Sequence, residues 1–195
     1  MTHILSFDCG KSNGVALGYF DDKTPYQLVS AFQFMDGPRG LSNWVKYHRV
    51  EHREDVPGDH WWDFDALTLP GYDILTIAEK FVPFPGKGFG QGLDSTLPLV
   101  GEGVLIALDV MPAYPDPRWR VARNMYLFGG KDLKQKKKYA RTFLKEKGMY
   151  VMPKELGQPN SDDAVSATLH GISYLAQILR HKLTSAMITE WEPGE

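Results

Sequence analysis

Short apolar runs separated by turn residues open the chain. The runs cover residues 4–7, 15–20 and 27–34. The segments between them, 8–14 and 21–25, are rich in Gly, Asn, Asp and Pro, which suit the backbone angles of tight turns. Runs of this length joined by short turns are typical of neighbouring antiparallel strands. The pattern therefore predicts that the domain begins with three antiparallel strands.

The remaining elements alternate between strand and helix patterns. The short apolar run at 74–78 is typical of a central strand, and 119–121 predicts another short strand. Helical spacing of apolar residues predicts helices over 95–109, 133–147 and 162–179. The stripe of the last helix consists of Val165, Leu169, Ile172, Ala176 and Leu179. This order of elements predicts an α/β fold with a mixed sheet.

The length of the chain fits one domain. A chain of 195 residues can bury a substantial core but is short for two domains. We expect a single domain over 1–184. Segment 39–65 fits neither pattern, since Pro57 and Gly58 interrupt its helical spacing, and we interpret it as an insertion. We expect 185–195 to be a flexible tail, because chain ends are common sites of disorder.

Several observations bear on the compartment. Cys9 is the only cysteine, which excludes an internal disulfide and fits a reducing environment. The first residues lack the basic and apolar regions of a signal peptide. No apolar run approaches the roughly 20 residues that cross a bilayer. We therefore expect a cytoplasmic protein, of a bacterium or of a host cell, with no membrane partner.

Charge is distributed unevenly, although the net charge is only −2. One segment carries a cluster of basic residues: Arg118, Arg120, Arg123, Lys131, Lys134, Lys136, Lys137, Lys138, Arg141, Lys145 and Lys147. Only Asp116, Asp132 and Glu146 oppose them there. Such asymmetry indicates a polyanionic partner, and a solvated helix face is the alternative.

Four carboxylates lie where apolar elements begin or end. Asp8 follows the first strand pattern, Glu79 follows the 74–78 run, and Asp162 and Asp163 precede the last helix. Alone, Asp8 is explained by a turn, and the aspartate pair by helix capping. A carboxylate at the end of a core strand is nevertheless costly to desolvate without a partner or a metal. Together, the four predict one metal-binding acidic cluster.

Such a cluster is suited to the cleavage of phosphate esters. Two divalent ions held by shared carboxylates can activate a water and stabilise the leaving oxygen of a scissile phosphate. Mg²⁺ prefers hard oxygen ligands and keeps open positions for water, and Mn²⁺ is an alternative. We therefore expect two Mg²⁺ ions per site.

The ordered motifs resemble those of a known family. Asp8 to Gly14 is similar to the D-x-G-x-x-x-G hairpin of the RuvC-type Holliday junction resolvases, within the RNase H-like superfamily. Glu79 matches the glutamate that ends their fourth strand. Lys134, four residues after a glycine, matches their lysine near the scissile phosphate, and Asp163 matches their last aspartate. Asn160 stands where that family has an acidic or histidine ligand, so either Asn160 or Asp162 supplies the fourth ligand.

The resemblance implies a fold and an activity. The fold would be RNase H-like, with a mixed five-stranded sheet of three antiparallel strands followed by parallel strands, and helices on both faces. The enzyme would be a Mg²⁺-dependent homodimer that nicks two opposing strands of a four-way DNA junction, leaving 5′-phosphate and 3′-hydroxyl ends. Its catalytic set would be Asp8, Glu79, Asp162, Asp163 and Lys134. The divergent segment 39–65 is compatible with a bacteriophage member of the family.

DNA contacts are implied for two groups of residues. Phe81 and Phe84 lie in the loop after Glu79, where the family carries an aromatic residue that stacks on bases. The basic residues would contact the phosphate backbone, which gives affinity without sequence information. This second group comprises Lys87, Arg118, Arg120, Arg123, Lys131, Lys136, Lys137, Lys138 and Arg141.

Three alternatives remain open at this point. The first is a catalytically silent protein that binds branched nucleic acid on the same scaffold. The second is a phosphotransferase of the actin-like superfamily, whose first hairpin has a similar motif but whose chains are usually much longer. The third is a nuclease of the same type that acts on RNA–DNA hybrids, flaps or replication forks.

Overall fold

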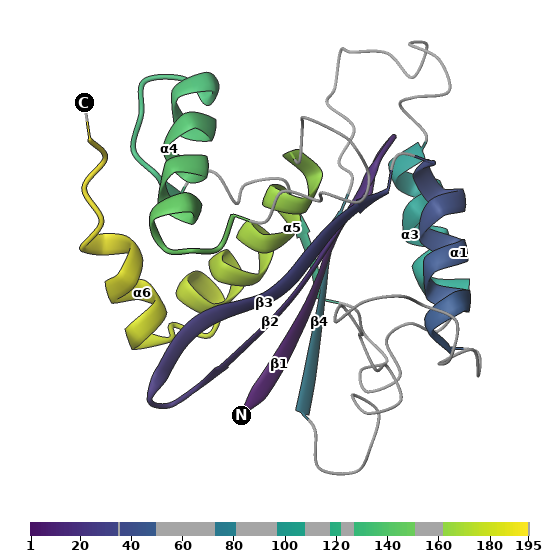
Figure 1. Ribbon diagram of the computed structural model, residues 1–195, viewed down its shortest axis with the longest axis horizontal. Coiled ribbons are helices and arrows are strands. Elements are labelled where there is room, and N and C mark those ends of the chain that lie inside the picture. The colour runs from purple at the N-terminus through teal and green to yellow at the C-terminus, as the bar shows by residue number, and fades with distance from the viewer. Residues whose placement is uncertain are drawn as a thin grey trace.

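A computed structural model gives the path of the chain (Figure 1). It describes residues 1–34, 36–49, 73–80, 97–107, 118–121, 127–150 and 162–194. In these parts of the chain, no helix is long and apolar enough to cross a membrane.

A five-stranded sheet forms the centre of the fold, with the strand order β3-β2-β1-β4-β5. The strands are β1 (Thr2–Asp8), β2 (Asn13–Asp21), β3 (Thr24–Phe34), β4 (Asp73–Lys80) and β5 (Arg118–Val121). β1, β2 and β3 pair antiparallel, whereas β4 is parallel to β1 and β5 is parallel to β4. The predicted mixed sheet of three antiparallel strands followed by parallel strands is confirmed.

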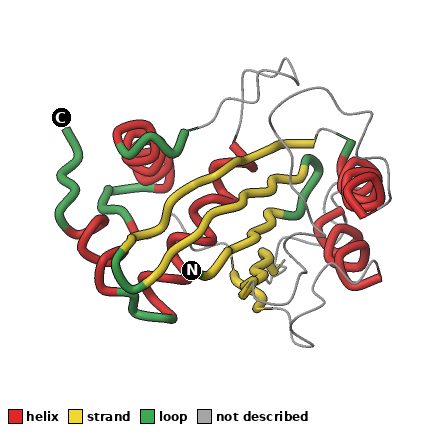
Figure 2. The backbone as a smooth tube through the Cα atoms, turned by 60° about the horizontal axis from the view of Figure 1, so that its bottom comes forward, coloured by secondary structure: helices red, strands yellow, loops and turns green. Residues whose placement is uncertain are grey.

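Helices cover both faces of this sheet, as predicted (Figures 1 and 2). One group consists of α1 (Gly37–Arg49) and α3 (Leu97–Ala107). The other consists of α4 (Leu133–Glu146), α5 (Asp162–Ser173), the π-helix η4 (Tyr174–Ile178) and α6 (Lys182–Thr189). α5 packs against β1, β2, β3 and β4, so it lies across the centre of the sheet.

The alternation of side chains along β1 and β4 decides which residues face α5. Ser6 faces the helix, because its hydroxyl donates a hydrogen bond of 2.6 Å to the Ala167 carbonyl. Asp8 lies two residues further and therefore points to the same face. Ser6 pairs with Ile77 in the parallel register, so Glu79 lies beside Asp8 on that face. The two carboxylates are thus placed side by side under α5 by strand register alone.

The core on this side is continuous and apolar. It joins strand residues to α4 and α5, and its buried members include Ile4, Leu75, Ile77, Phe143, Leu144, Leu169 and Ile172. These side chains fix α4 and α5 on the sheet. The acidic residues at the strand ends therefore lie on a rigid support.

The close approach of α5 to β2 requires a glycine. A Cβ on Gly14 would overlap the backbone carbonyl of Asp163, in the first turn of α5. Any larger residue at this position would therefore push the start of α5 away from the sheet.

Two expectations from the sequence are wrong, and both concern the C-terminal part. The last helix does not continue to Leu179: its α-helical part ends at Ser173, η4 follows, and Leu179 is 43% exposed. Residues 185–191 are not a flexible tail. Helix α6 spans most of them, and the Trp191 ring packs 5.6 Å from the Phe143 ring centroid while its Nε1 donates to Glu146.

The expected insertion at 39–65 is described only in part. Residues up to Arg49 belong to α1, which begins at Gly37 and contacts α3, β2 and β3. Residues 50–65 lie outside the part of the chain that the structure describes.

Gly14→Ala tests the seating of α5. We expect the added Cβ to lower the free energy of unfolding by about 1–3 kcal/mol, since a backbone carbonyl cannot rotate away from it. Chemical denaturation measures this change. Gly129→Ala is the control, because an added Cβ there meets nothing within 4 Å. An unchanged stability of Gly14→Ala would contradict the close approach.

Candidate metal centre

Asp8 and Glu79 lie at the carboxyl ends of two neighbouring parallel strands, β1 and β4. Phe7 pairs with Ala78, so the two carboxylates follow at the next position of the register. The Glu79 side chain is 19% exposed, so it is largely buried but still reached by solvent. This edge of the sheet is where ligand sites of open α/β folds usually lie.

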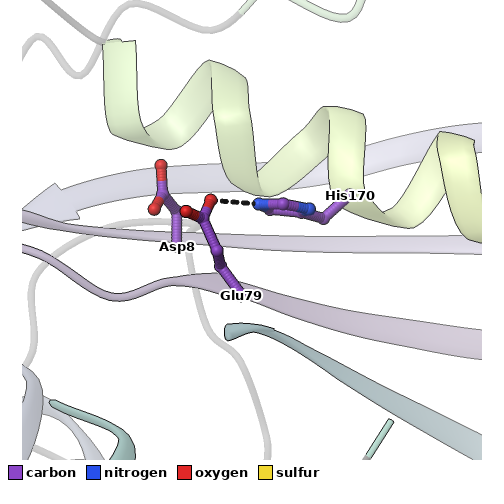
Figure 3. A group of neighbouring side chains, drawn as sticks. All are labelled: Asp8, Glu79 and His170. Carbon is purple, nitrogen blue, oxygen red and sulfur yellow. Dashed lines mark hydrogen bonds and ion pairs between the residues drawn. The ribbon is translucent and has the colours of Figure 1, made fainter. Parts of the chain in front are cut away.

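A histidine that the sequence analysis did not single out completes this group. His170 of α5 is fully buried, and its Nε2 lies 2.6 Å from Oε2 of Glu79. Ligating atoms of Asp8, Glu79 and His170 all lie within 4.8 Å of one another. Figure 3 shows the Glu79 carboxylate between the Asp8 carboxylate and the His170 ring. Three donors from three elements therefore converge on one small region.

Asp163 approaches the same region from the first turn of α5. Its carboxylate accepts a hydrogen bond from the Ser12 hydroxyl, and its backbone N–H donates to Oε1 of Gln33 at 3.1 Å. Its negative charge acts on both Asp8 and Glu79. The turn after β1 and the end of β3 therefore hold the third carboxylate next to the other two.

Burial raises the pKa of all three carboxyl groups, and neighbouring negative charges add to the effect. Burial is the main cause for Asp8, whose pKa rises well above its usual range, and the charge of Glu79 adds to it. Burial raises the pKa of Glu79 to about 7; a hydrogen bond with Asp8 opposes this shift, and the charges of Asp163 and Glu102 add to it. Burial likewise raises the pKa of Asp163, opposed by the Ser12 hydrogen bond. The cluster therefore resists full ionisation unless a cation compensates for its charge.

The donor set fits a divalent metal ion. Carboxylate oxygens are the ligands of Mg²⁺ and Mn²⁺, and an imidazole is compatible with Mn²⁺. The ligating atoms are close enough to share one ion, and raised carboxyl pKa values are what an anionic site without its cation should show. Two residues of this group, Asp8 and Glu79, belong to the acidic cluster that the sequence predicted.

The structure brings together some of the predicted site residues and separates others. Asp8 and Glu79 lie together, and the charge of Asp163 acts on both. Asp162 instead forms an ion pair with Arg141 of α4, and both side chains are partly exposed. Its role as fourth ligand stays a prediction. Several predicted residues lie outside the described part of the chain: Phe81, Phe84, Lys87, Arg123 and Asn160.

The basic residues gather on α4. Lys134, Lys138, Arg141 and Lys145 are spaced so that they share one helix face, and they line an open groove along it. Lys131, Lys136 and Lys137 belong to the same region, whereas Arg118 and Arg120 lie on β5. The charge of Lys137 acts on Asp163, so the basic surface reaches the acidic cluster.

In retrospect, the position of His170 in the sequence indicates that it shares a helix face with Asp163. It lies seven residues after Asp163, which places both on one face of an α-helix. A histidine within an apolar helix is more often a core residue than part of a site, so this spacing alone does not identify it. Ser12 and Gln33, which hold Asp163, carry no separate signal.

Comparison with known proteins finds similarity in structure only. No protein-family model matches the chain, and no curated protein matches it. The structure of Thermus thermophilus RuvC matches with a TM-score of 0.51 at 9% identity, covering 91% of this chain and 96% of that one. Thermus thermophilus RuvC in complex with a Holliday junction substrate matches with a TM-score of 0.42 at 10% identity, over the same shares.

The likeness to RuvC concerns the fold. The chain adopts a RuvC-like resolvase fold, as the motifs of the sequence predicted. It extends over nearly the whole of both chains, so the conclusion does not rest on one shared hairpin.

Stability in the absence of metal should depend on pH through Glu79. Its pKa is about 7 in the folded protein and near the ordinary 4.5 in the unfolded chain, so folding favours its protonated form. Without divalent ions, the free energy of unfolding should therefore fall as the pH rises from about 5 to 8. Glu79→Gln cannot ionise and should reduce this fall, as measured by urea unfolding in EDTA.

The control for this experiment is Asp22→Asn, which removes an exposed carboxylate from the turn after β2. It should keep the pH dependence of the wild type. An identical fall in stability for Glu79→Gln and the wild type would show that Glu79 does not carry the effect.

Proposed function

We propose that this protein is a metal-dependent endonuclease that resolves four-way DNA junctions by paired symmetric nicks, leaving 5′-phosphate and 3′-hydroxyl ends. The observation that carries the proposal is the convergence of Asp8 and Glu79 with His170, together with the charge of Asp163, which acts on both carboxylates. These residues lie at the edge of the central sheet, in a chain with a RuvC-like fold. Other branched DNA, and RNA–DNA hybrids, are the nearest alternative substrates.

The proposed chemistry assigns a role to each residue of the cluster. Asp8 and Glu79 would hold a divalent ion between the strand ends, and Asp163 would contribute to the same or a second ion. Ser12 and Gln33 keep Asp163 in place through their hydrogen bonds. Bound Mg²⁺ or Mn²⁺ would supply an activated water and stabilise the leaving oxygen. Lys134 is proposed to act near the scissile phosphate.

The position of α4 supports DNA as the substrate. Its lysines and Arg141 offer a positive surface that suits a phosphate backbone. Arg141 pairs with Asp162, and Lys137 acts on the neighbouring Asp163, so this surface adjoins the metal centre. A strand bound along α4 would therefore reach the acidic residues. Phe81 or Phe84 is proposed to stack on an unpaired base at the junction.

Paired nicks require two active sites, so we propose a homodimer. Each chain would form one domain, and its metal centre would act on one of two opposing strands. A cytoplasmic location follows from this substrate and remains part of the proposal.

A nicking assay tests the proposed activity. A labelled, immobile four-way junction is incubated with Mg²⁺ or Mn²⁺, and linear duplex serves as the substrate control. The wild type should give symmetric paired nicks in the junction. Asp8→Asn and Glu79→Gln should lower the cleavage rate by at least about 100-fold. Losing a residue that only orients a metal ligand costs up to about 100-fold, and losing a ligand should cost at least as much. Asp22→Asn should cleave like the wild type.

Other outcomes distinguish the alternatives. Tight junction binding without cleavage in any divalent metal would favour a silent binding protein. Preferred cleavage of flaps or hybrids would keep the nuclease and replace the substrate. No binding to any nucleic acid would exclude both the nuclease and the silent binding protein, and would favour the phosphotransferase alternative.

The basic face of α4 gives a separate prediction on binding. Lys138→Ala and Lys145→Ala should each weaken junction binding and lower the slope of log K against log salt by about one. Fluorescence anisotropy with the Asp8→Asn protein measures binding without cleavage. Lys23→Ala removes an exposed lysine from the turn after β2 and serves as the control. A salt slope unchanged in both α4 variants would show that this face does not contact the backbone.

A further inference from the structure

His170 is a polar residue in an otherwise tightly packed place. The side chain is fully buried, and the next residue, Gly171, packs against Tyr26, Ile4 and Ser6 of the sheet. A buried imidazole is costly unless its nitrogens are hydrogen-bonded. Simple core packing would be served better by an apolar residue of similar size. The contacts of the ring therefore indicate a function.

The ring makes one well-defined contact with the metal centre. Nε2 lies 2.6 Å from Oε2 of Glu79, and because an ionised carboxylate can only accept, this contact is a hydrogen bond donated by Nε2–H whenever Glu79 is ionised. The carboxylate lies between the His170 ring and Asp8 (Figure 3). Strand β4 fixes the backbone of Glu79 but leaves its side-chain torsions free. The imidazole, together with the hydrogen bond from Asp8, therefore favours one orientation of this carboxylate.

We infer that His170 is a positioning residue, whose Nε2–H holds Oε2 of Glu79 so that this carboxylate and that of Asp8 can bind one divalent ion together. The inference rests on the proposed metal-dependent function and adds a residue to it.

Donation from Nε2–H to an ionised Glu79 would distinguish this role from direct metal binding. A nitrogen that donates a proton to Glu79 has no lone pair left in that direction to bind an ion. Hydrogen-bonding partners of this kind order a ligand before the metal arrives, and losing one typically costs about 10–100-fold in metal affinity. The effect should therefore appear in metal binding itself, and it does not require cleavage to be measured.

Calorimetric titration with Mn²⁺ at pH 8 tests the inference. His170→Leu fills the space but removes the donor, and its dissociation constant for Mn²⁺ should rise by about 10–100-fold. His170→Gln places an amide N–H near the position of Nε2 and should recover most of the affinity. Thr168→Val is the matched control. It removes a buried hydroxyl from the same helix, one that donates to the Ala164 carbonyl, and should bind like the wild type.

A spectroscopic readout separates positioning from ligation. Pulsed electron paramagnetic resonance of Mn²⁺ bound to protein with ¹⁵N-labelled histidine detects a nitrogen bonded directly to the ion. Positioning predicts no such coupling in the wild type. Should His170→Leu fail to fold, as judged by thermal unfolding, His170→Asn replaces it, because its amide lies near Nδ1 and is too short to reach Glu79.

Each result has a clear meaning. Wild-type affinity in the variants that lack the donor would overturn the inference and leave the proposed function standing. A directly bonded histidine nitrogen, lost in His170→Leu, would also overturn it, because His170 would then be a ligand. If the wild type binds no Mn²⁺ and matches Glu79→Gln in the titration, the proposed function fails first.

Discussion

The seating of α5 on the sheet is the constraint on which the rest depends. Ser6 bonds to the backbone of this helix at Ala167, and the absent side chain of Gly14 lets its first turn approach β2. These contacts bring Asp163 and His170 over strand ends that carry the other two acids. Asp8, Glu79, Asp163 and His170 belong to strands or to α5, so backbone geometry places them. A small displacement of α5 would separate the helical members of the site from the strand members.

That arrangement opposes stability. Three carboxylates are held close together in a half-buried place, where burial raises the pKa of each and the charge of Asp163 raises those of Asp8 and Glu79 further. An isolated domain gains nothing from such repulsion, whereas a site for a divalent cation requires it. The same reasoning explains the ion pair of Arg141 with Asp162. It compensates the charge of Asp162 next to the cluster, while Asp163 remains close to Asp8 and Glu79. Stability without metal is therefore lower than the core alone would allow.

The sequence predicted what local patterns encode. The strands, and with them Asp8 and Glu79, follow from apolar runs that end in an acid. The pairing of Asp162 with Arg141 does not follow from local patterns. Adjacent helical residues point about 100° apart, and only the packing of α5 decides which of Asp162 and Asp163 faces the sheet. From the sequence alone, His170 is interpreted as a core residue, and only its contact with Glu79 in the structure indicates another role. The prediction of a flexible C-terminal tail was wrong, because this segment is ordered by tertiary contacts of Trp191 with α4.

The central claim is that this acidic edge binds divalent cations. Crystals of the protein soaked in Mn²⁺ test it most directly, since anomalous scattering locates the ion without reference to activity. The account predicts a peak in contact with carboxylate oxygens of both Asp8 and Glu79, with Asp163 beside it. Manganese bound only elsewhere on the surface, with this cluster free of it at saturating concentration, would contradict the account.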